Sequence, residues 1–166
     1  MVVTGNVQVS PAHLSLGRDL VVPANISEEV LEPFRCLARV IHQERTHSKS
    51  ANTFNCPLAI MQLSHAGRQS PNILGGRRPF APPLSPSAIA LGSGKRDKDF
   101  ISDLFHRLLF QTPQSMSLAN IDDVVEAFVR GAKLAVLSGF DGVQLHAAHG
   151  CEYFFLYNWL SINTVS

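Results

Sequence analysis

The sequence predicts an α/β domain built on a parallel sheet. Three short apolar segments with strand character alternate with two segments of helical periodicity, in the order strand, helix, strand, helix, strand. This alternation is typical of βαβ units, in which a helix crosses over the sheet between two parallel strands. The chain has 166 residues, of which 45% are hydrophobic and 16% are charged. That is enough for one domain with a buried core.

The first strand and helix occupy the amino-terminal quarter of the chain. The β-branched run Val2-Val3-Thr4 predicts a short strand that ends at Gly5-Asn6. Residues 32–43 have helical spacing, and Pro33 fits the first turn of that helix, where a missing N–H is harmless. The apolar positions of this helix are Leu31, Phe34, Leu37, Ala38 and Ile41.

The later elements have clearer patterns. The continuous apolar run from Leu58 to Leu63 predicts a strand buried on both faces. Asp122 and Asp123 suit the first turn of a second helix, and Gly139 can end it. The segment from Asp141 to His146 predicts the last strand. The apolar stripe of the second helix consists of Ile121, Val124, Val125, Phe128, Ala132 and Ala135.

A long Pro-rich loop, residues 64–116, is expected between the second strand and the second helix. It holds six of the ten prolines and the basic cluster Lys95-Arg96-Asp97-Lys98. Loops of this length inside a compact domain are usually functional. Arg68, Arg77 and Arg78 could bind phosphate there, although loop arginines are more often solvated.

The charge balance indicates neither nucleic acid nor a membrane as a partner. Fourteen basic residues against thirteen acidic residues give a formal charge of +1. Cys36, Cys56 and Cys151 lie far apart and are expected to be reduced thiols in a cytoplasmic protein. No secretory signal opens the chain, and no apolar stretch approaches the roughly 20 residues of a membrane helix.

Polar residues follow each predicted strand, in the segments 4–6, 64–68 and 146–150. Sites form at the carboxyl ends of strands in parallel sheets. Gln62 lies inside a strand, so its amide needs a partner, either the edge of a ligand or neighbouring backbone. The pattern leaves these two alternatives open.

His146 and His149 can converge on one point if the last strand ends at His146. As hydrogen-bond donors they could hold a carbonyl or phenolate oxygen, or they could simply pack at the strand end. A zinc site that includes His65 is a further alternative, although no acidic residue or cysteine completes it at useful spacing. We therefore expect no metal.

Three segments together resemble the old yellow enzyme (NADH:flavin oxidoreductase) family, particularly its fungal members. They are Leu58-Ala-Ile-Met-Gln-Leu-Ser-His-Ala-Gly-Arg-Gln69, Phe80-Ala-Pro-Pro-Leu-Ser-Pro-Ser-Ala-Ile89 and Gly139-Phe-Asp-Gly-Val-Gln-Leu-His-Ala-Ala-His-Gly150. Their joint presence and order are highly specific. The resemblance runs from about Val3 to Gly150.

The resemblance implies an eight-stranded (β/α)8 TIM barrel with FMN at the carboxyl ends of its strands. This chain would be a partial barrel that covers about strands two to four. By resemblance, Gln62 hydrogen-bonds the pyrimidine edge of the flavin, and Asn6 lies where the backbone of the second strand approaches the ring. His146 and His149 match the pair that holds the oxygen of the substrate.

The implied activity is that of an FMN-dependent oxidoreductase of the ene-reductase type. NAD(P)H reduces FMN, and reduced FMN passes hydride to an electron-poor alkene, typically an enone. The histidines would stabilise the developing enolate by hydrogen bonds. The flavin carries the redox step, and the protein supplies placement.

The chain departs from the family pattern after Gly150. Cys151 occupies the position of the tyrosine that protonates the substrate, and residues 151–166 no longer resemble the family, which suggests a translated intron or a frameshift. We therefore expect two parts, a barrel fragment over 1–150 and a non-family tail over 151–166. The chain is also expected to be truncated at both ends and inactive on its own, because it lacks the other strands of the barrel.

Two other functions remain open. The fragment could form a working flavoprotein together with a second chain or copy. It could instead be a non-enzymatic interaction module, or an inactive product, in which exposed sheet edges favour oligomers or aggregation. A metal-dependent hydrolase on a similar barrel is a more distant alternative.

Overall fold

The computed structural model describes residues 1–42, 57–91 and 100–147 of the chain. Its main sheet has four parallel strands in the order β2-β1-β3-β6. They are β1 (Val2–Gln8), β2 (Leu20–Val21), β3 (Ala59–Ser64) and β6 (Gly142–Leu145). The predicted alternation of strands and helices is confirmed, and the short β2 adds a fourth strand that the sequence pattern did not predict.

The first helix, α1 (Glu28–Ile41), begins earlier than expected. Ser27 is its N-cap, and Glu28 and Glu29 occupy its first turn, where carboxylates favour the positive end of the helix dipole. Pro33 therefore lies inside the helix, and its expected place in the first turn was wrong. Leu31, Phe34 and Ala38 are the buried positions of the helix, as their spacing predicted.

The long helix, α3 (Leu118–Leu137), begins with a reciprocal cap. Ser117 Oγ accepts from the N–H of Asn120 at 3.2 Å, and Asn120 Oδ1 accepts from the N–H of Ser117 at 3.0 Å. Because the helix begins at Leu118, Asp122 and Asp123 lie beyond its first turn, which corrects their expected place. The cap that starts the helix is this Ser-x-x-Asn pair.

Gly139 ends α3, as predicted from sequence. The N–H of Gly139 donates to the carbonyl of Val136 at 3.1 Å, and the N–H of Phe140 donates to that of Ala135 at 3.0 Å. These two bonds form a Schellman motif, which needs a left-handed residue at the position of Gly139. Its φ of 80° satisfies this requirement.

Gly139→Ala is expected to lower the free energy of unfolding by about 1 kcal/mol. A Cβ at this position would meet nothing within 4 Å, so the cost comes from the backbone conformation and not from a clash. Urea denaturation measures the change. A matched Gly5→Ala variant, also in open space but at a glycine without positive φ, should cost less. Equal costs would contradict this explanation.

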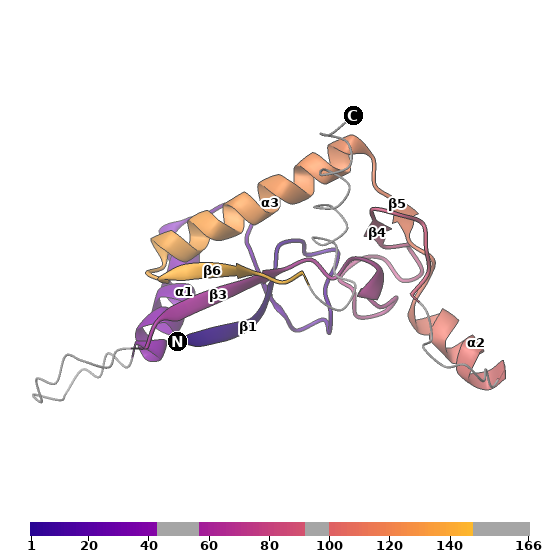
Figure 1. Ribbon diagram of the computed structural model, residues 1–166, viewed down its shortest axis with the longest axis horizontal. Helices are drawn as coiled ribbons and strands as arrows, with labels where there is room; N and C mark the ends of the chain where they lie inside the picture. Colours follow the sequence, from indigo (N-terminus) through magenta and orange to yellow (C-terminus); the bar gives the residue numbers. More distant parts are fainter. Residues whose placement is uncertain (43–56, 92–99, 148–166) are drawn as a thin grey trace, which may run out of the picture.

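The two helices cover one face of the sheet (Figure 1). The core joins α1 and α3 to the strand residues that point towards them, and the contacts around Gly131 are close: a Cβ there would lie 2.9 Å from Leu63 and 3.2 Å from Val22. This core contains the strand residues Val7, Ala59, Met61 and Leu63, and Val9 directly after β1.

The opposite face of β3 is less enclosed than its continuous apolar run predicted. Ile60 and Gln62 alternate with the fully buried residues and are half-buried. The expected burial on both faces is therefore only partly correct. This second face, which no described helix covers, carries the polar residues of the sheet.

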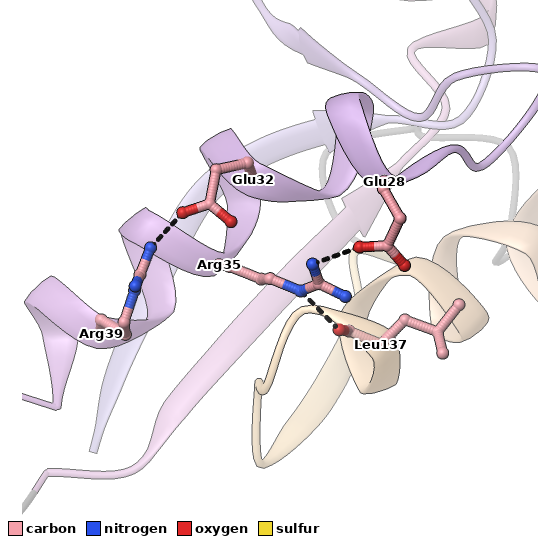
Figure 2. Close-up of polar contacts among 5 residues, drawn as sticks. All are labelled: Glu28, Glu32, Arg35, Arg39 and Leu137. Atoms are coloured by element: carbon pink, nitrogen blue, oxygen red, sulfur yellow. Dashed lines mark hydrogen bonds and ion pairs between the residues drawn. The ribbon is translucent and has the colours of Figure 1, made fainter.

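Two salt bridges lie along α1 (Figure 2), and a small cavity lies between the end of α1 and the end of α3. Arg35 contacts Glu28 at 2.6 Å and donates to the carbonyl of Leu137 at 3.4 Å, and Arg39 contacts Glu32. The cavity, of about 350 Å³, is lined by Arg35, Ala38, Arg39, His42, Leu137, Ser138 and Gly139. His42 also contacts Asp141 at 2.8 Å and so ties the end of α1 to the start of β6.

The segment predicted as a long loop has structure of its own. It contains the short 3₁₀ helix η1 (Gly67–Gln69), the strand pair β4 (Leu84–Ser85) and β5 (Gln114–Ser115), and the helix α2 (Phe100–Leu109). In Figure 1, this segment lies beyond the carboxyl ends of β1 and β3, and α2 extends away from the rest. Among the described helices, none is long and apolar enough to span a membrane.

Candidate functional site

The candidate site begins with an irregularity in β1. Val3 pairs with Ile60 and Asn6 pairs with Gln62, so β1 contains one residue more than β3 between these pairs. Such a bulge re-aims side chains and interrupts the ladder of backbone hydrogen bonds. Here the hydroxyl of Thr4 accepts the backbone N–H of Gln62 at 3.0 Å. The sequence predicted that the strand ends at Gly5 and Asn6. This was wrong, because β1 continues past the bulge to Gln8.

The bulge places two predicted site residues in contact. Gln62 Nε2 donates to Asn6 Oδ1, and both side chains are half-buried on the face opposite the helices. Gln144 pairs in register with Gln62 on the neighbouring strand and is exposed. Because in-register residues of neighbouring strands point to the same face, three amides form a row across the sheet.

A second polar row lies one step towards the carboxyl ends. Gln8 pairs in register with Ser64, and both residues are fully buried. Gln8 Nε2 donates to Ser15 Oγ at 2.7 Å. Gln8 Oε1 and Ser64 Oγ have no hydrogen-bond partner in the described part of the chain. Buried polar atoms of this kind need a partner such as a bound molecule or water.

His146 continues this second row. Its backbone N–H donates to the carbonyl of Leu63 at 2.9 Å, which extends the ladder between β3 and β6 by one residue. The side chain is half-buried and lies two residues after Gln144, so it points to the same face. His149 and Cys151 lie outside the described residues, so their predicted roles stay predictions.

The ring of His65 does not join these two rows of polar side chains but packs against a second histidine. The rings of His65 and His13 lie 4.5 Å apart with an interplanar angle of 32°, and His65 is 1% exposed. Burial, with the neighbouring His13, lowers the pKa of His65 to about 3. Burial, with the Arg77 charge, lowers the pKa of His13 to about 4. Both imidazoles are therefore neutral at pH 7.

The protein holds His13 in one tautomer. The backbone N–H of Leu84 donates to His13 Nε2 at 3.1 Å, so the ring proton is on Nδ1, which donates to Ser10 Oγ at 2.9 Å. His13 thereby joins the segment after β1 to β4. Over the described residues, no three histidine, cysteine or acidic side chains gather as a metal site would require.

Two of the loop arginines bind protein groups. Arg68 is buried and donates to Ser85 Oγ at 3.0 Å and Ser87 Oγ at 3.2 Å. Arg77 donates to the carbonyl of Ala81 at 2.8 Å and to that of Ser70 at 2.8 Å. Arg78 is exposed.

The sequence interpretation missed several residues of this site. Gln144 could have been found, because it lies two residues before His146 on a predicted strand and must share its face. Thr4 and Gln8 could not, because the bulge decides their orientation. His13 gave no signal, since its partner His65 lies 52 positions later in the chain.

Structures of known proteins define the class. An old yellow enzyme homologue from Zymomonas mobilis matches with a TM-score of 0.61 and 22% identity, over 90% of this chain and 35% of that chain. Morphinone reductase matches with a TM-score of 0.63 and 19% identity, over 90% of this chain and 36% of that chain. The described fold is therefore that of part of an old yellow enzyme-type α/β barrel.

The family follows from sequence comparisons. The model of the NADH:flavin oxidoreductase / NADH oxidase family matches residues 1–162, and the chain belongs to this family of FMN-dependent oxidoreductases, which use NADH or NADPH as reductant. The NADH-dependent flavin oxidoreductase iliE of Neonectria sp. (strain DH2) is 39% identical over 90% of this chain and 18% of its own length. The NADH-dependent flavin oxidoreductase iccE of Talaromyces variabilis is 35% identical over 90% of this chain and 33% of its own length.

These comparisons confirm the predicted family and fold class. The chain spans about a third or less of the length of these relatives. The predicted boundary at residue 150 stays a prediction.

Proposed function

We propose that this chain forms part of the flavin- and substrate-binding end of an ene-reductase-type NAD(P)H oxidoreductase. The observation that carries the proposal is the contact between Gln62 and Asn6 at the open face of the sheet. When bound, FMN would take hydride from NAD(P)H and pass it to an electron-poor alkene. The residues of this chain would bind and orient the two molecules.

The polar groups present fit the pyrimidine edge of a flavin. That edge offers an N–H donor between two carbonyl acceptors. Gln62 uses one N–H of its amide on Asn6, which leaves its Oε1 to accept and its second N–H to donate. The contact also holds the amide in one orientation, so it meets such an edge without further ordering of the side chain.

The position of His146 supports a role in binding the oxygen of the substrate. It lies at the carboxyl end of β6, in register with the row of Gln8 and Ser64, which is one step further than the row of Gln62. A ring N–H there would donate to the carbonyl oxygen of an enone and stabilise the negative charge that develops on it. His149 would supply a second donor, and Cys151 would stand in place of the proton-donating tyrosine.

We infer that this chain has little catalytic activity on its own. Within the described residues, β2 and β6 are the edge strands of the main sheet, and Val143 and Leu145 are 39% and 37% exposed. A site at the carboxyl ends of strands needs several strands to enclose the reactants. The four described strands of the main sheet would by themselves leave both FMN and substrate partly in water, which weakens hydrogen bonds to developing charge.

The decisive experiment is an FMN titration of the purified chain, followed by flavin fluorescence. Gln62→Ala is expected to raise the Kd of FMN about tenfold to a hundredfold, because two hydrogen bonds are lost. Gln114→Ala, which removes an exposed glutamine on β5, is the matched control and should leave the Kd unchanged. Saturable binding that Gln62→Ala does not weaken would contradict the assigned role of this residue.

One observation favours the second candidate, a non-enzymatic interaction module. The protruding helix α2 exposes an apolar stripe at helical spacing, and the exposed fractions are 50–79%. The residues of the stripe are Ile101, Leu104, Phe105 and Leu108. Cooperative unfolding without any FMN binding would favour this function over the first.

A further inference from the structure

A strained turn follows η1 in the described part of the chain. The N–H of Ala81 donates to the carbonyl of Arg78 at 3.1 Å, with Pro79 and Phe80 between them. Phe80 has a φ of 61° and is the one non-glycine residue with positive φ among the residues described. Proline followed by a positive φ is the pattern of a type II turn, whose third position favours glycine. A phenylalanine there is unfavourable, so some other property of the residue must compensate.

The turn is held rigidly. The Arg77 guanidinium donates to the carbonyls of Ala81 and Ser70, each at 2.8 Å, and to Ser70 Oγ at 2.6 Å. Its contact with the carbonyl of Ala12, at 3.4 Å, joins the turn to the segment after β1. Gly76 has a φ of 80°, and a Cβ there would lie 1.9 Å from the carbonyl oxygen of Pro11. The surroundings therefore impose the conformation of Phe80.

Packing of the Phe80 side chain does not compensate for the strained backbone. Phe80 is 60% exposed and does not belong to the hydrophobic core. The neighbouring Arg78 is exposed as well. A rigid turn therefore presents an aromatic ring and a guanidinium to solvent within three residues, at the end of the sheet where Gln62 and His146 lie. In Figure 1, this segment lies beyond the carboxyl ends of β1 and β3.

The same end of the molecule carries an excess of positive charge. The described segments 10–19 and 65–91 contain four arginines and one acidic residue, Asp19. The carboxylate of Asp19 accepts the backbone N–H groups of Ser15 and Leu16 at 2.7 and 3.2 Å. The arginines are Arg18, Arg68, Arg77 and Arg78. An anionic ligand would be attracted to this surface.

We propose that Phe80 and Arg78 bind the adenosine diphosphate end of NAD(P)H. The adenine ring would stack on Phe80, and a phosphate would pair with the Arg78 guanidinium. The choice of this ligand rests on the proposed function, since the proposed function identifies NAD(P)H as the reductant. The nicotinamide end would then extend towards the row of Gln62 and His146.

Phe80→Gly tests the proposal, because glycine is the residue that the turn itself favours. We expect the variant to unfold at the same temperature as the parent chain or a higher one, and to bind ADP about five- to tenfold more weakly. Phe80→Trp keeps an aromatic ring and should retain ADP binding. Arg78→Gln should weaken ADP binding, and nicotinamide mononucleotide should bind the parent and Phe80→Gly equally.

Titrations of the full chain with ADP, monitored by ligand-observed NMR, need no flavin. Equal ADP affinity of the parent and Phe80→Gly would overturn the proposal, and so would a parent chain that does not bind ADP. FMN binding that depends on Gln62, without ADP binding, would leave the proposed function standing while this inference fails. ADP binding that depends on Phe80, without FMN binding, would support this inference while the proposed function fails.

Discussion

Acidification from pH 7 to pH 4 is expected to destabilise the folded chain by about 3 kcal/mol or more through His13 and His65. Both imidazoles are buried and neutral, with pKa values lowered from 6.5 to about 4 and about 3. In the unfolded chain they take up protons near pH 6.5. Their contribution to stability is therefore fully present above pH 6.5 and is lost as the pH falls towards the folded-state pKa values.

Urea denaturation at a series of pH values measures this effect, and a variant isolates it from the titration of carboxylates. His65→Phe keeps an aromatic ring against His13 but removes one titrating group, so its stability should fall less between pH 7 and pH 4. His106→Gln, on the protruding helix α2, is the control and should follow the parent. A parent and a His65→Phe variant with parallel pH profiles would show that the buried pair does not govern acid stability.

Leu63→Ala is expected to lower the free energy of unfolding by about 3 kcal/mol. Leu63 is fully buried at the centre of the core, and its methyl groups lie against Gly131 of α3. Removing its side chain leaves a cavity between β3 and α3, where the helix approaches the sheet so closely that it cannot collapse further without moving the strand.

Leu58→Ala provides the matched control for this substitution. Leu58 precedes the same strand and is 52% exposed, so its truncation should cost less than about 1 kcal/mol. Chemical denaturation of the two variants, analysed with a common slope, gives the comparison. Similar losses for both would contradict the placement of the core on this face of β3.

The strained turn at Phe80 and the amide contact at Gln62 are held in place by different parts of the fold. Gln62 lies on a central strand whose neighbours on both sides hold its backbone, so its side chain is positioned by the sheet. Phe80 lies on a loop and is positioned by Arg77. A variant such as Arg77→Ala should therefore release the turn without disturbing the contact between Gln62 and Asn6.

Local sequence patterns were sufficient to predict the parallel α/β class, the approximate bounds of β3 and α3, and the family. The apolar run of β3 and the helical spacing of α1 and α3 predicted these elements, and the end of α3 at Gly139 follows from a local backbone rule. The motifs around Gln62 and His146 also predicted that both residues lie near the carboxyl ends of their strands, where the structure has them, while their roles in a site stay predictions. Each of these signals comes from short stretches of the chain and from the order in which they follow one another.

The remaining features could not be predicted from such patterns, because they depend on groups that are distant in sequence. The bulge in β1 is defined by its register with β3, and it brings Asn6 to Gln62 across 56 positions. The neutral state of His65 depends on burial by other segments, which lowers its pKa, and on the neighbouring His13. The turn at Phe80 is held by Arg77, whose partners Ala12, Ser70 and Ala81 come from two segments of the chain. Local patterns do not carry such information, since long-range contacts select one conformation among several that the local sequence permits.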